Sequence, residues 1–441
     1  MNTMKIYNYP TQKAKSRLKA IVNRGLKFNQ KDLNLVSRIL EDVRKNKDTA
    51  VVKYVNSFDS KKVDLSSLKV SPQEFKTALK AIKPSFLKSL NLAADQIETF
   101  HQNQLPKSWV NTNRKGTFLG QLVHPLDAAG IYIPGGREGK TPLVSSILMC
   151  AIPAKIAGVK KISITSPPRK DGTLDPHLLV AAKKVGVDTV YKAGSAWGIG
   201  ALAYGTETIS PVDIIAGPGN IYVTLAKKIL AGIVGIDMIA GPSEILIIAD
   251  ETAKPEFAAA DLLSQAEHDT LASAILVTTS KKLALDTAAV VEKELNKLKR
   301  REIAIKSIKN FGAIMIVPDL ETAVELANKI APEHLELHIE SPFSYVGQIS
   351  NAGAIFMGHF TPEPVGDYIA GPNHVLPTAG TARFSSALSV EHFVKKTSLI
   401  HYTKEAFYKE AQDIIRLAEI EGLEAHLKAV KVRLKKIKLK K

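Results

Sequence analysis

The chain has 441 residues, 45% of them hydrophobic, and carries a formal net charge of +17 at pH 7. This length and apolar content predict a globular protein of about two or three domains and exclude a small disulfide scaffold. The sequence has no uninterrupted apolar run of about 18 residues and no apolar core in its N-terminal segment, which argues against a transmembrane helix or a secretory signal. With a single cysteine, Cys150, it is expected to be cytoplasmic.

The positive charge is concentrated at the two ends of the chain. Residues 1–31 and residues 427–441 each contain eight Lys or Arg and no acidic residue, which leaves a net charge of only +1 for the middle. Such ends can bind nucleic acid or anionic surfaces nonspecifically, but no aromatic platform accompanies them. We therefore expect solvated, partly frayed ends, with a nucleic-acid-binding role as an alternative that a steep salt dependence would reveal.

The first part of the chain, residues 32–104, has a helical pattern. Leu33, Val36 and Leu40 recur at the three-and-four spacing of one helix face, and Ser71–Glu74 has the cap and early proline of a helix start. We expect these helices to cover a β-sheet. Short apolar runs separated by turns follow over residues 116–133 and end in a buried strand and a glycine-rich loop.

Expected strands and helices then alternate in two blocks, which predicts βαβ units and mostly parallel sheets. The first block contains expected helices at 145–157, 176–185, 196–204 and 220–231 and expected strands at 161–165, 189–192 and 212–216. The second block contains expected strands at 244–248, 273–278, 313–317, 335–339 and 354–357 and expected helices at 255–267, 281–298, 320–329 and 342–349. A loop over 361–380 precedes further helices, from 389 to 416 and from 421 into the basic tail. Two doubly wound α/β units result, with a cleft expected between them.

Two adjacent proton-transfer groups, Glu333 and His334, lie at an expected loop-to-strand junction just after Pro332. A histidine titrates near neutral pH, and a carboxylate can orient it or prime a water molecule. The pair is therefore a candidate general base with an assisting group. In a strand the two side chains would face opposite ways, so an ordinary surface pair is the alternative.

Residues of metal-ligand type occur at three other places in the sequence. Gln265 and His268 are one helical turn apart, so both side chains project from the same helix face. Asp367 lies in a loop restrained by prolines and glycine, while Glu421 and His426 lie on a late helix. Two imidazoles, one carboxylate and one amide oxygen suit zinc or manganese better than a thiolate-preferring ion.

Several cofactor-like patterns have structural alternatives. Gly198–Ala203 fits the G-x-G-x-x-A pattern, but its glycines lie inside an expected helix and no acid follows about 20 residues later, which favours close helix packing. The triplet Gly139-Lys140-Thr141 lacks the first glycine of a phosphate loop. Cys150 could trap an aldehyde, but its apolar neighbours favour inert packing. Trp197 and Tyr132 could stack on a cofactor ring or simply pack.

Seven longer motifs occur between residues 130 and 385. They are G-I-Y-I-P-G-G (130–136), A-G-P-G-N (216–220), I-A-G-P-S-E (239–244), L-S-Q-A-E-H (263–268), A-P-E-H-L-E (331–336), G-D-Y-I-A-G-P-N-H (366–374) and L-P-T-A-G-T-A-R-F-S (376–385). Together they resemble the histidinol dehydrogenase family, and the resemblance extends from about residue 30 to residue 426.

The resemblance implies a zinc-dependent, four-electron oxidation of L-histidinol to L-histidine through L-histidinal, with two NAD molecules, in the last steps of histidine biosynthesis. His334 would be the general base for the alcohol and hydrate protons, and Glu333 would activate water at the aldehyde stage. The zinc ligands implied by position are Gln265, His268, Asp367 and His426.

The resemblance also implies substrate and cofactor contacts. The substrate contacts would be Ser243, Gln265, His268, His334, Asp367, His374, Glu421 and His426, and the NAD contacts would be Tyr132, Asn220 and Trp197. In the family, the helix that carries Glu421 and His426 comes from the partner subunit of a domain-swapped homodimer. One chain alone would then have an incomplete site, and neither a membrane nor a specific nucleic acid is expected as a partner.

Two departures from the family pattern lie on the cofactor side. Trp197 stands where the family usually has a glutamine that contacts NAD, and the loop of residues 137–144 is about three residues longer than usual. A stacking Trp197 could replace the lost hydrogen bond. Neither departure affects the expected zinc ligands or the Glu333–His334 pair.

The family fold implies two incomplete Rossmann-like doubly wound domains plus a helical C-terminal dimerisation arm. Residues 1–31 would form a basic segment, and residues 32–128 with 242–380 the first Rossmann-like domain, which carries the base and most metal ligands. Residues 129–241 would form the second, NAD-side domain, and residues 381–441 the arm with its basic tail. The alternative activity is a related dehydrogenase for another small polyol or amino alcohol.

Overall fold

The computed structural model describes residues 4–25, 28–135, 142–187 and 189–434. The chain forms two compact units, one of Met1–Gln104 with Leu126–Phe393 and the other of Leu105–Pro125 with Val394–Lys441. No helix in these described ranges is both long and apolar enough to cross a membrane. The triplet 139–141, and with it most of the long loop 137–144, lies outside the described residues.

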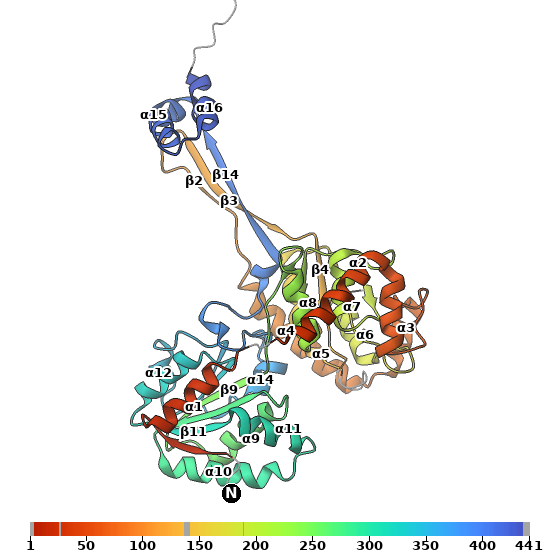
Figure 1. The fold of residues 1–441 in the computed structure, drawn as a ribbon, viewed down its shortest axis with the longest axis vertical. Coiled ribbons are helices and arrows are strands. Elements are labelled where there is room, and N and C mark those ends of the chain that lie inside the picture. The colour runs from red at the N-terminus through yellow and green to blue at the C-terminus, as the bar shows by residue number, and fades with distance from the viewer. Residues whose placement is uncertain (1–3, 26–27, 136–141, 188, 435–441) are drawn as a thin grey trace, which may run out of the picture. The chain divides into compact units, whose positions relative to one another are not determined.

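A six-stranded sheet in the first unit carries the candidate base. It is parallel throughout and has the order β1-β11-β10-β9-β12-β13. Figure 1 labels its strands β9 and β11. Its strands are β1 (Ile6–Asn8), β9 (Glu244–Ala249), β10 (Ser273–Thr278), β11 (Ala313–Ile316), β12 (His334–His338) and β13 (Ala354–Met357). Adjacent residues of β9, Ile247 and Ile248, belong to different apolar clusters, so both faces of the sheet are buried.

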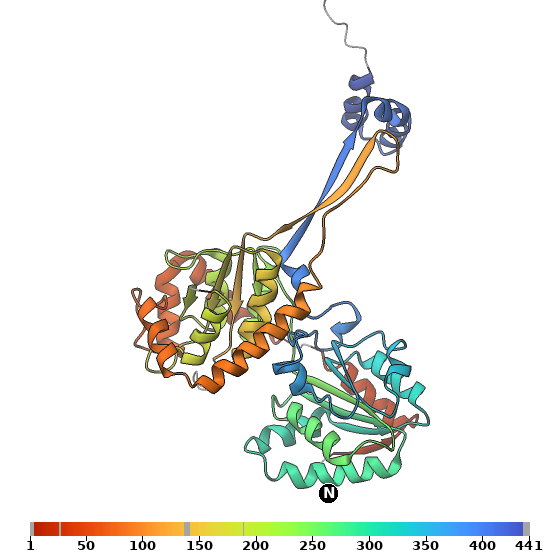
Figure 2. The same ribbon diagram turned by 180° about the vertical axis from the view of Figure 1, so that it is seen from behind.

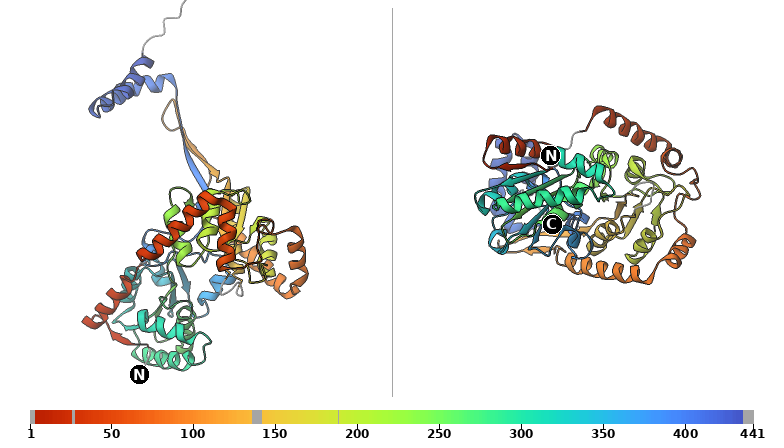
Figure 3. Two further views of the ribbon diagram at one scale, coloured as in Figure 1. Left: turned by 45° about the vertical axis from the view of Figure 1, so that its right-hand side comes forward. Right: turned by 90° about the horizontal axis from the view of Figure 1, so that it is seen from below.

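Helices cover both faces of this sheet, as Figure 3 shows. One face is covered by α9 (Pro255–Ala266), α10 (Lys281–Leu295) and α11 (Arg301–Phe311), and the other by α1 (Gln12–Val22) and α12 (Leu320–Ile330). The short helix α13 (Phe343–Val346) connects β12 to β13. The alternating strands and helices predicted for this block are confirmed, whereas α11 was not predicted.

The N-terminal segment belongs to this sheet, so the frayed segment predicted from its charge is wrong for the described residues. β1 pairs in parallel with β11, and Ala14, Leu18 and Ile21 of α1 are buried. These apolar residues recur at helical spacing, while Lys13 and Lys15 face solvent. The charge therefore lies on the outer face of α1 and does not prevent packing.

The second sheet is five-stranded, parallel throughout, and has the order β6-β5-β4-β7-β8. Its strands are β4 (Ala128–Tyr132), β5 (Lys161–Thr165), β6 (Thr189–Tyr191), β7 (Ile214–Ala216) and β8 (Gly235–Ile236). The connecting helices are α5 (Val144–Ala157), α6 (Pro176–Lys184), α7 (Ser195–Tyr204) and α8 (Ile221–Leu230). The two doubly wound blocks expected from the sequence are thus both present.

Three N-terminal helices pack on this second sheet system. They are α2 (Gln30–Phe58), which contacts α7 and α8, α3 (Pro72–Ala81), which contacts α6, and α4 (Pro84–Gln102), which contacts α5. The domain boundaries expected from the sequence placed residues 32–128 with the six-stranded sheet. The observed helices instead contact the helices of the five-stranded sheet. Gly200 of α7 supplies a physical reason, because a Cβ there would lie 3.0 Å from Leu40 and 3.5 Å from Val43. The glycines of the G-x-G-x-x-A pattern serve close packing, as expected.

The second unit contains an antiparallel sheet and two helices. Its strands, in the order β14-β3-β2, are β14 (Val394–Tyr402), β3 (Thr117–Pro125) and β2 (Trp109–Asn111). Helices α15 (Lys404–Ile420) and α16 (Glu424–Leu434) follow β14, and Figure 2 shows them at the end of the long β3–β14 pair. The helix predicted from residue 389 is therefore wrong over 394–402. All nine residues of β14 pair with β3, and this long-range pairing overrides the local pattern.

Candidate active site

Glu333 and His334 lie at the amino end of one strand of the six-stranded sheet. β12 begins at His334 and pairs in parallel with β9, which begins at Glu244. Helix α9 follows β9 and runs back across the sheet, so its C-terminal end, with Gln265, reaches the same edge. Open α/β sheets usually bind ligands at the carboxyl ends of their strands, so this site occupies the opposite edge.

One nitrogen of the His334 ring is fixed by the backbone. Nδ1 lies 2.8 Å from the carbonyl oxygen of Glu244, so Nδ1 carries the hydrogen and donates it. Nε2 is then the unprotonated nitrogen and can accept a proton. Burial lowers the pKa of His334 to about 4, so the imidazole is neutral at pH 7.

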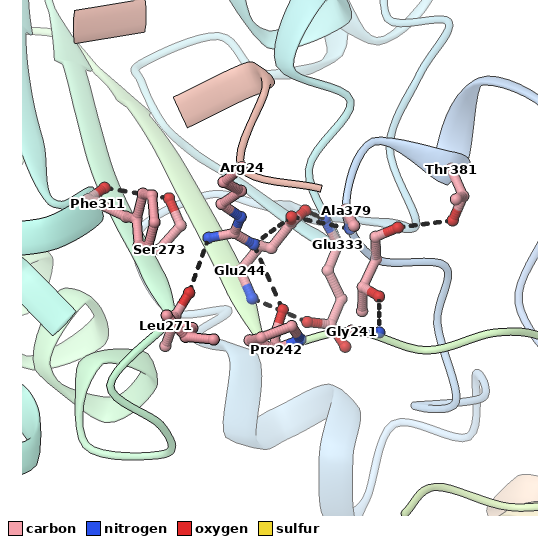
Figure 4. A network of polar contacts seen from close by, with 12 residues as sticks. Arg24, Gly241, Pro242, Glu244, Leu271, Ser273, Phe311, Glu333, Ala379 and Thr381 are labelled. Atoms are coloured by element: carbon pink, nitrogen blue, oxygen red, sulfur yellow. Dashed lines mark hydrogen bonds and ion pairs between the residues drawn. The ribbon is translucent and has the colours of Figure 1, made fainter. Parts of the chain in front are cut away.

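Glu333 is held by a reciprocal pair of hydrogen bonds with Glu244 (Figure 4). The Glu244 N–H donates to Oε2 of Glu333 at 2.9 Å, and the Glu333 N–H donates to Oε2 of Glu244 at 3.1 Å. Burial, followed by the charge of Glu244, raises the pKa of the Glu333 carboxyl well above its ordinary value. A carboxyl group with a raised pKa holds a proton more readily than an ordinary glutamate, which suits it to accept one from water.

Glu244 in turn forms a buried ion pair with Arg24, whose Nη2 contacts Oε1 of Glu244. Arg24 also donates to the carbonyl oxygens of Pro242 at 3.4 Å and Leu271 at 3.3 Å, and the Ala379 N–H donates to Oε1 of Glu244 at 2.9 Å (Figure 4). The sequence reasoning missed this support. Arg24 was counted with the basic segment, and no local signal links it to a residue 220 positions away.

A second carboxyl group, Glu363, accompanies Asp367. Both lie on α14 (Glu363–Tyr368), where the sequence predicted a loop, and their spacing of four places them on one helix face. Ligand atoms of His334, Glu363 and Asp367 all lie within 4.8 Å of one another. Burial raises the pKa of both carboxyls, that of Glu363 to about 8 with the Asp367 charge as the second cause. The i,i+4 spacing is the signal that could have revealed Glu363.

Gln265 and His268 lie at and just beyond the end of α9. Gln265 is buried, and among residues 4–25, 28–135, 142–187 and 189–434 neither its amide nitrogen nor its amide oxygen has a hydrogen-bond partner. Leaving a buried amide unpaired costs free energy, so its oxygen is free for a ligand such as a metal ion. His268 is exposed and is near enough to His334 to lower its pKa, after the larger effect of burial.

His374 joins α14 to α5. Its Nδ1 lies 3.1 Å from the carbonyl oxygen of Asp367, and its Nε2 lies 3.4 Å from the hydroxyl of Ser146. Burial lowers the pKa of His374 to about 4. A cavity of about 190 Å³ is lined by both Asp367 and His374. Ser243, just before β9, accepts the N–H of Ser273 through its carbonyl oxygen at 3.0 Å.

The residues expected to contact NAD lie near the carboxyl ends of the five-stranded sheet, the edge at which such sheets usually bind ligands. Tyr132 ends β4, and its hydroxyl accepts the N–H of Ser195 at 3.1 Å. The Asn220 side chain caps α8. Trp197 is buried and stacks on Phe58 at 5.4 Å between ring centroids, and its Nε1–H has no hydrogen-bond partner among the described side chains and backbone.

Glu421 and His426 belong to the second unit. Glu421 is the residue at the C-terminal end of α15, His426 lies on α16, and both side chains are exposed. The first unit therefore brings together the expected base, its neighbouring glutamate and the expected ligand Asp367, and Gln265 is near enough to Glu363 to lower the pKa of that carboxyl. The contribution of Glu421 and His426 stays a prediction.

The fold and this site together define an α/β enzyme with a buried neutral imidazole, a carboxyl of raised pKa and a cluster of nitrogen and oxygen ligands. Comparisons with known proteins give the family. The profile of the histidinol dehydrogenase family matches residues 23–434. The chain therefore belongs to the histidinol dehydrogenase family, as the sequence motifs predicted, and is an NAD-dependent oxidoreductase.

Individual relatives agree over nearly the whole chain. The histidinol dehydrogenase of Oleidesulfovibrio alaskensis is 55% identical over 400 residues, which cover 91% of this chain and 92% of the relative. That of Carboxydothermus hydrogenoformans is 52% identical over 399 residues, covering 90% and 93%. The crystal structure of histidinol dehydrogenase from Elizabethkingia anophelis is similar with a TM-score of 0.92, at 39% identity and over 98% of each chain.

Proposed function

We propose that this protein oxidises L-histidinol to L-histidine through L-histidinal, with two NAD molecules and one substrate-holding zinc ion per subunit. The observation that carries the proposal is the His334 ring. Its Nδ1–H donates to the Glu244 carbonyl, and a ring nitrogen lies within 4.8 Å of ligand atoms of Glu363 and Asp367. A proton acceptor is thus placed beside groups able to hold a metal-bound substrate.

Four residues would hold the zinc ion: Gln265, His268 and Asp367 of one chain and His426 of the partner subunit. The buried amide of Gln265 fits this role, because its oxygen accepts no hydrogen bond from the residues that the structure describes. When bound, zinc would hold the amino and imidazole nitrogens of the substrate, and NAD would accept one hydride at each oxidation stage.

The chain's own residues account for the proton transfers. At the first stage, Nε2 of His334 accepts the hydroxyl proton while the substrate carbon loses hydride, and the alcohol becomes an aldehyde. At the second stage, Glu333 takes a proton from water as the water oxygen bonds to the aldehyde carbon, and protonated His334 returns its proton to the aldehyde oxygen, which gives the hydrate. His334, neutral again, then accepts a proton from the hydrate as the second hydride leaves, and the resulting carboxylic acid ionises to the carboxylate.

A homodimer would complete the site. The second unit has a small apolar core of Ala411, Ile415 and Val430. It also exposes large apolar side chains, among them Ile400 (71% exposed), Leu417 (63%) and Ile420 (83%). Apolar side chains gathered on so small a unit favour burial against another protein surface, and a second copy of this chain is the partner we propose.

The experiment that tests the proposed substrate compares L-histidinol with amino alcohols that lack an imidazole, such as L-alaninol. NADH formation is measured at equal concentrations, and the product is identified by chromatography. We expect rapid NADH formation and L-histidine only with L-histidinol. Equal rates with L-alaninol, or no NADH with L-histidinol, would contradict the proposal.

A further inference from the structure

A second cluster of ligand-type side chains lies apart from the expected zinc ligands. Asp261 of α9 and Glu336 and His338 of β12 bring two carboxylates and an imidazole together. Nε2 of His338 lies 3.3 Å from Oε2 of Glu336 and 3.7 Å from Oδ2 of Asp261, and the three ligand atoms all lie within 4.8 Å of one another. None of the three residues belongs to the ligand set expected from the family.

The cluster is buried, and three of its polar atoms have no hydrogen-bond partner among the described residues. Asp261 is 8% exposed, Glu336 0% and His338 1%. Within the part of the chain that the structure describes, both ring nitrogens of His338 and Oε2 of Glu336 lack a hydrogen-bond partner. Buried polar atoms without a hydrogen-bond partner are rare in folded proteins and cost free energy. In this cluster, Nε2 of His338 and Oε2 of Glu336 lie next to each other.

No lysine or arginine pairs with these carboxylates in the described ion pairs, where both contact only His338. Burial, followed by the charge of Glu336, raises the pKa of Asp261 to about 7. Two neighbouring buried carboxylates need either a shared proton or a cation. A divalent cation would also give the unpaired His338 nitrogen and the free Glu336 oxygen a partner.

We propose that Asp261, Glu336 and His338 bind a second divalent metal ion, with Zn²⁺ or Mn²⁺ as the class their nitrogen and oxygen atoms favour. Ligand atoms held about 2.1 Å from a tetrahedral ion lie about 3.4 Å from one another. The 3.3 Å and 3.7 Å separations about the His338 nitrogen match this spacing.

The position of the cluster indicates what such an ion does. Asp261 lies one turn before Gln265 on α9, and Glu336 lies two residues after His334 on the same face of β12. Oε1 of Glu336 accepts the N–H of Glu363, the first residue of α14, at 2.8 Å. The second ion therefore ties together the three elements that carry Gln265, His334 and Asp367.

Metal analysis of the full-length protein tests the proposal. The protein is stripped with a chelator, reloaded with Zn²⁺ alone or Mn²⁺ alone, desalted and measured by elemental mass spectrometry. We expect two equivalents per chain in the parent and one in His338→Gln. The exposed His401→Gln is the matched control and keeps two.

His268→Asn separates the two sites, because it removes an expected ligand of the first ion only. We expect one equivalent in this variant, and none when it is combined with His338→Gln. Equal metal content in the parent and His338→Gln would overturn the proposal. If His338→Gln does not fold, a Co²⁺ absorption titration of the parent decides: saturation at two equivalents supports the second site, and saturation at one overturns it.

Discussion

Replacing Arg24 by alanine tests whether the N-terminal segment supports the catalytic residues. The change removes a guanidinium that pairs with Glu244 and donates to the carbonyls of Pro242 and Leu271. The Arg24 and Glu244 side chains are only 6% and 7% exposed, so solvent cannot replace the lost partner. Breaking a buried pair by removing one member typically costs about 3–5 kcal/mol.

The free energy of unfolding, measured by urea denaturation, should fall by about this amount in Arg24→Ala. The matched control is Arg44→Ala, because Arg44 pairs with Glu41 while their side chains are 65% and 48% exposed. An exposed pair of this kind contributes about 1 kcal/mol or less. Turnover should also fall in Arg24→Ala, because Glu244 positions both Glu333 and His334.

The pH dependence of the fall in unfolding free energy gives a second test of Arg24→Ala. Burial raises the pKa of Glu244 even with Arg24 present, so losing the arginine raises this pKa further. A carboxyl whose folded pKa is raised stabilises the protein below its unfolded pKa and loses that stabilisation as the pH rises through the folded pKa. The fall in unfolding free energy caused by Arg24→Ala should therefore be larger at pH 8 than at pH 5. Equal losses in Arg24→Ala and Arg44→Ala would refute the reasoning.

Three further predictions concern histidines. His334→Asn should lower turnover by roughly 10²- to 10⁴-fold with metal content unchanged, because it removes only the proton acceptor; steady-state kinetics and elemental analysis check this. His426→Asn should lower metal content relative to His401→Asn, and equal zinc occupancy would refute its assignment as a ligand. Burial lowers the pKa of His334 and His374 to about 4, so stability should be full above about pH 6.5 and fall as the pH falls toward 4. Urea denaturation between pH 7 and pH 4.5 should show a shallower fall in unfolding free energy for His334→Asn than for the parent. Identical slopes for the two proteins would contradict the lowered pKa of His334.

The central parallel strands were predictable because their physical signal is local. In Glu244–Ala249, the five residues after Glu244 form a continuous apolar run typical of a strand buried on both faces, and the helix between this strand and Ser273–Thr278 has a proline at its start. Strand β14 was not predictable in this way. Most of its nine residues are exposed, so its sequence lacks a buried stripe, and its pairing with β3 joins residues far apart in the chain.

The same difference between local and long-range signals applies to the candidate site. Glu333 with His334, and Gln265 with His268, were visible as short-range patterns, and the family motifs supplied their expected roles. The support for Glu333 was not visible, because the Arg24–Glu244 pair joins residues 220 positions apart. Long-range electrostatic partners leave no periodic trace in a sequence, so only the packed structure reveals them.

The proposed four-electron oxidation is tested most directly by counting NADH. The full-length protein is incubated with limiting L-histidinol and excess NAD, and NADH, L-histidinal and L-histidine are quantified. The proposed reaction predicts two NADH and one L-histidine for each L-histidinol consumed, with activity abolished by a chelator and restored by zinc. One NADH per L-histidinol with accumulation of the aldehyde, or NADH formation indifferent to the chelator, would contradict it.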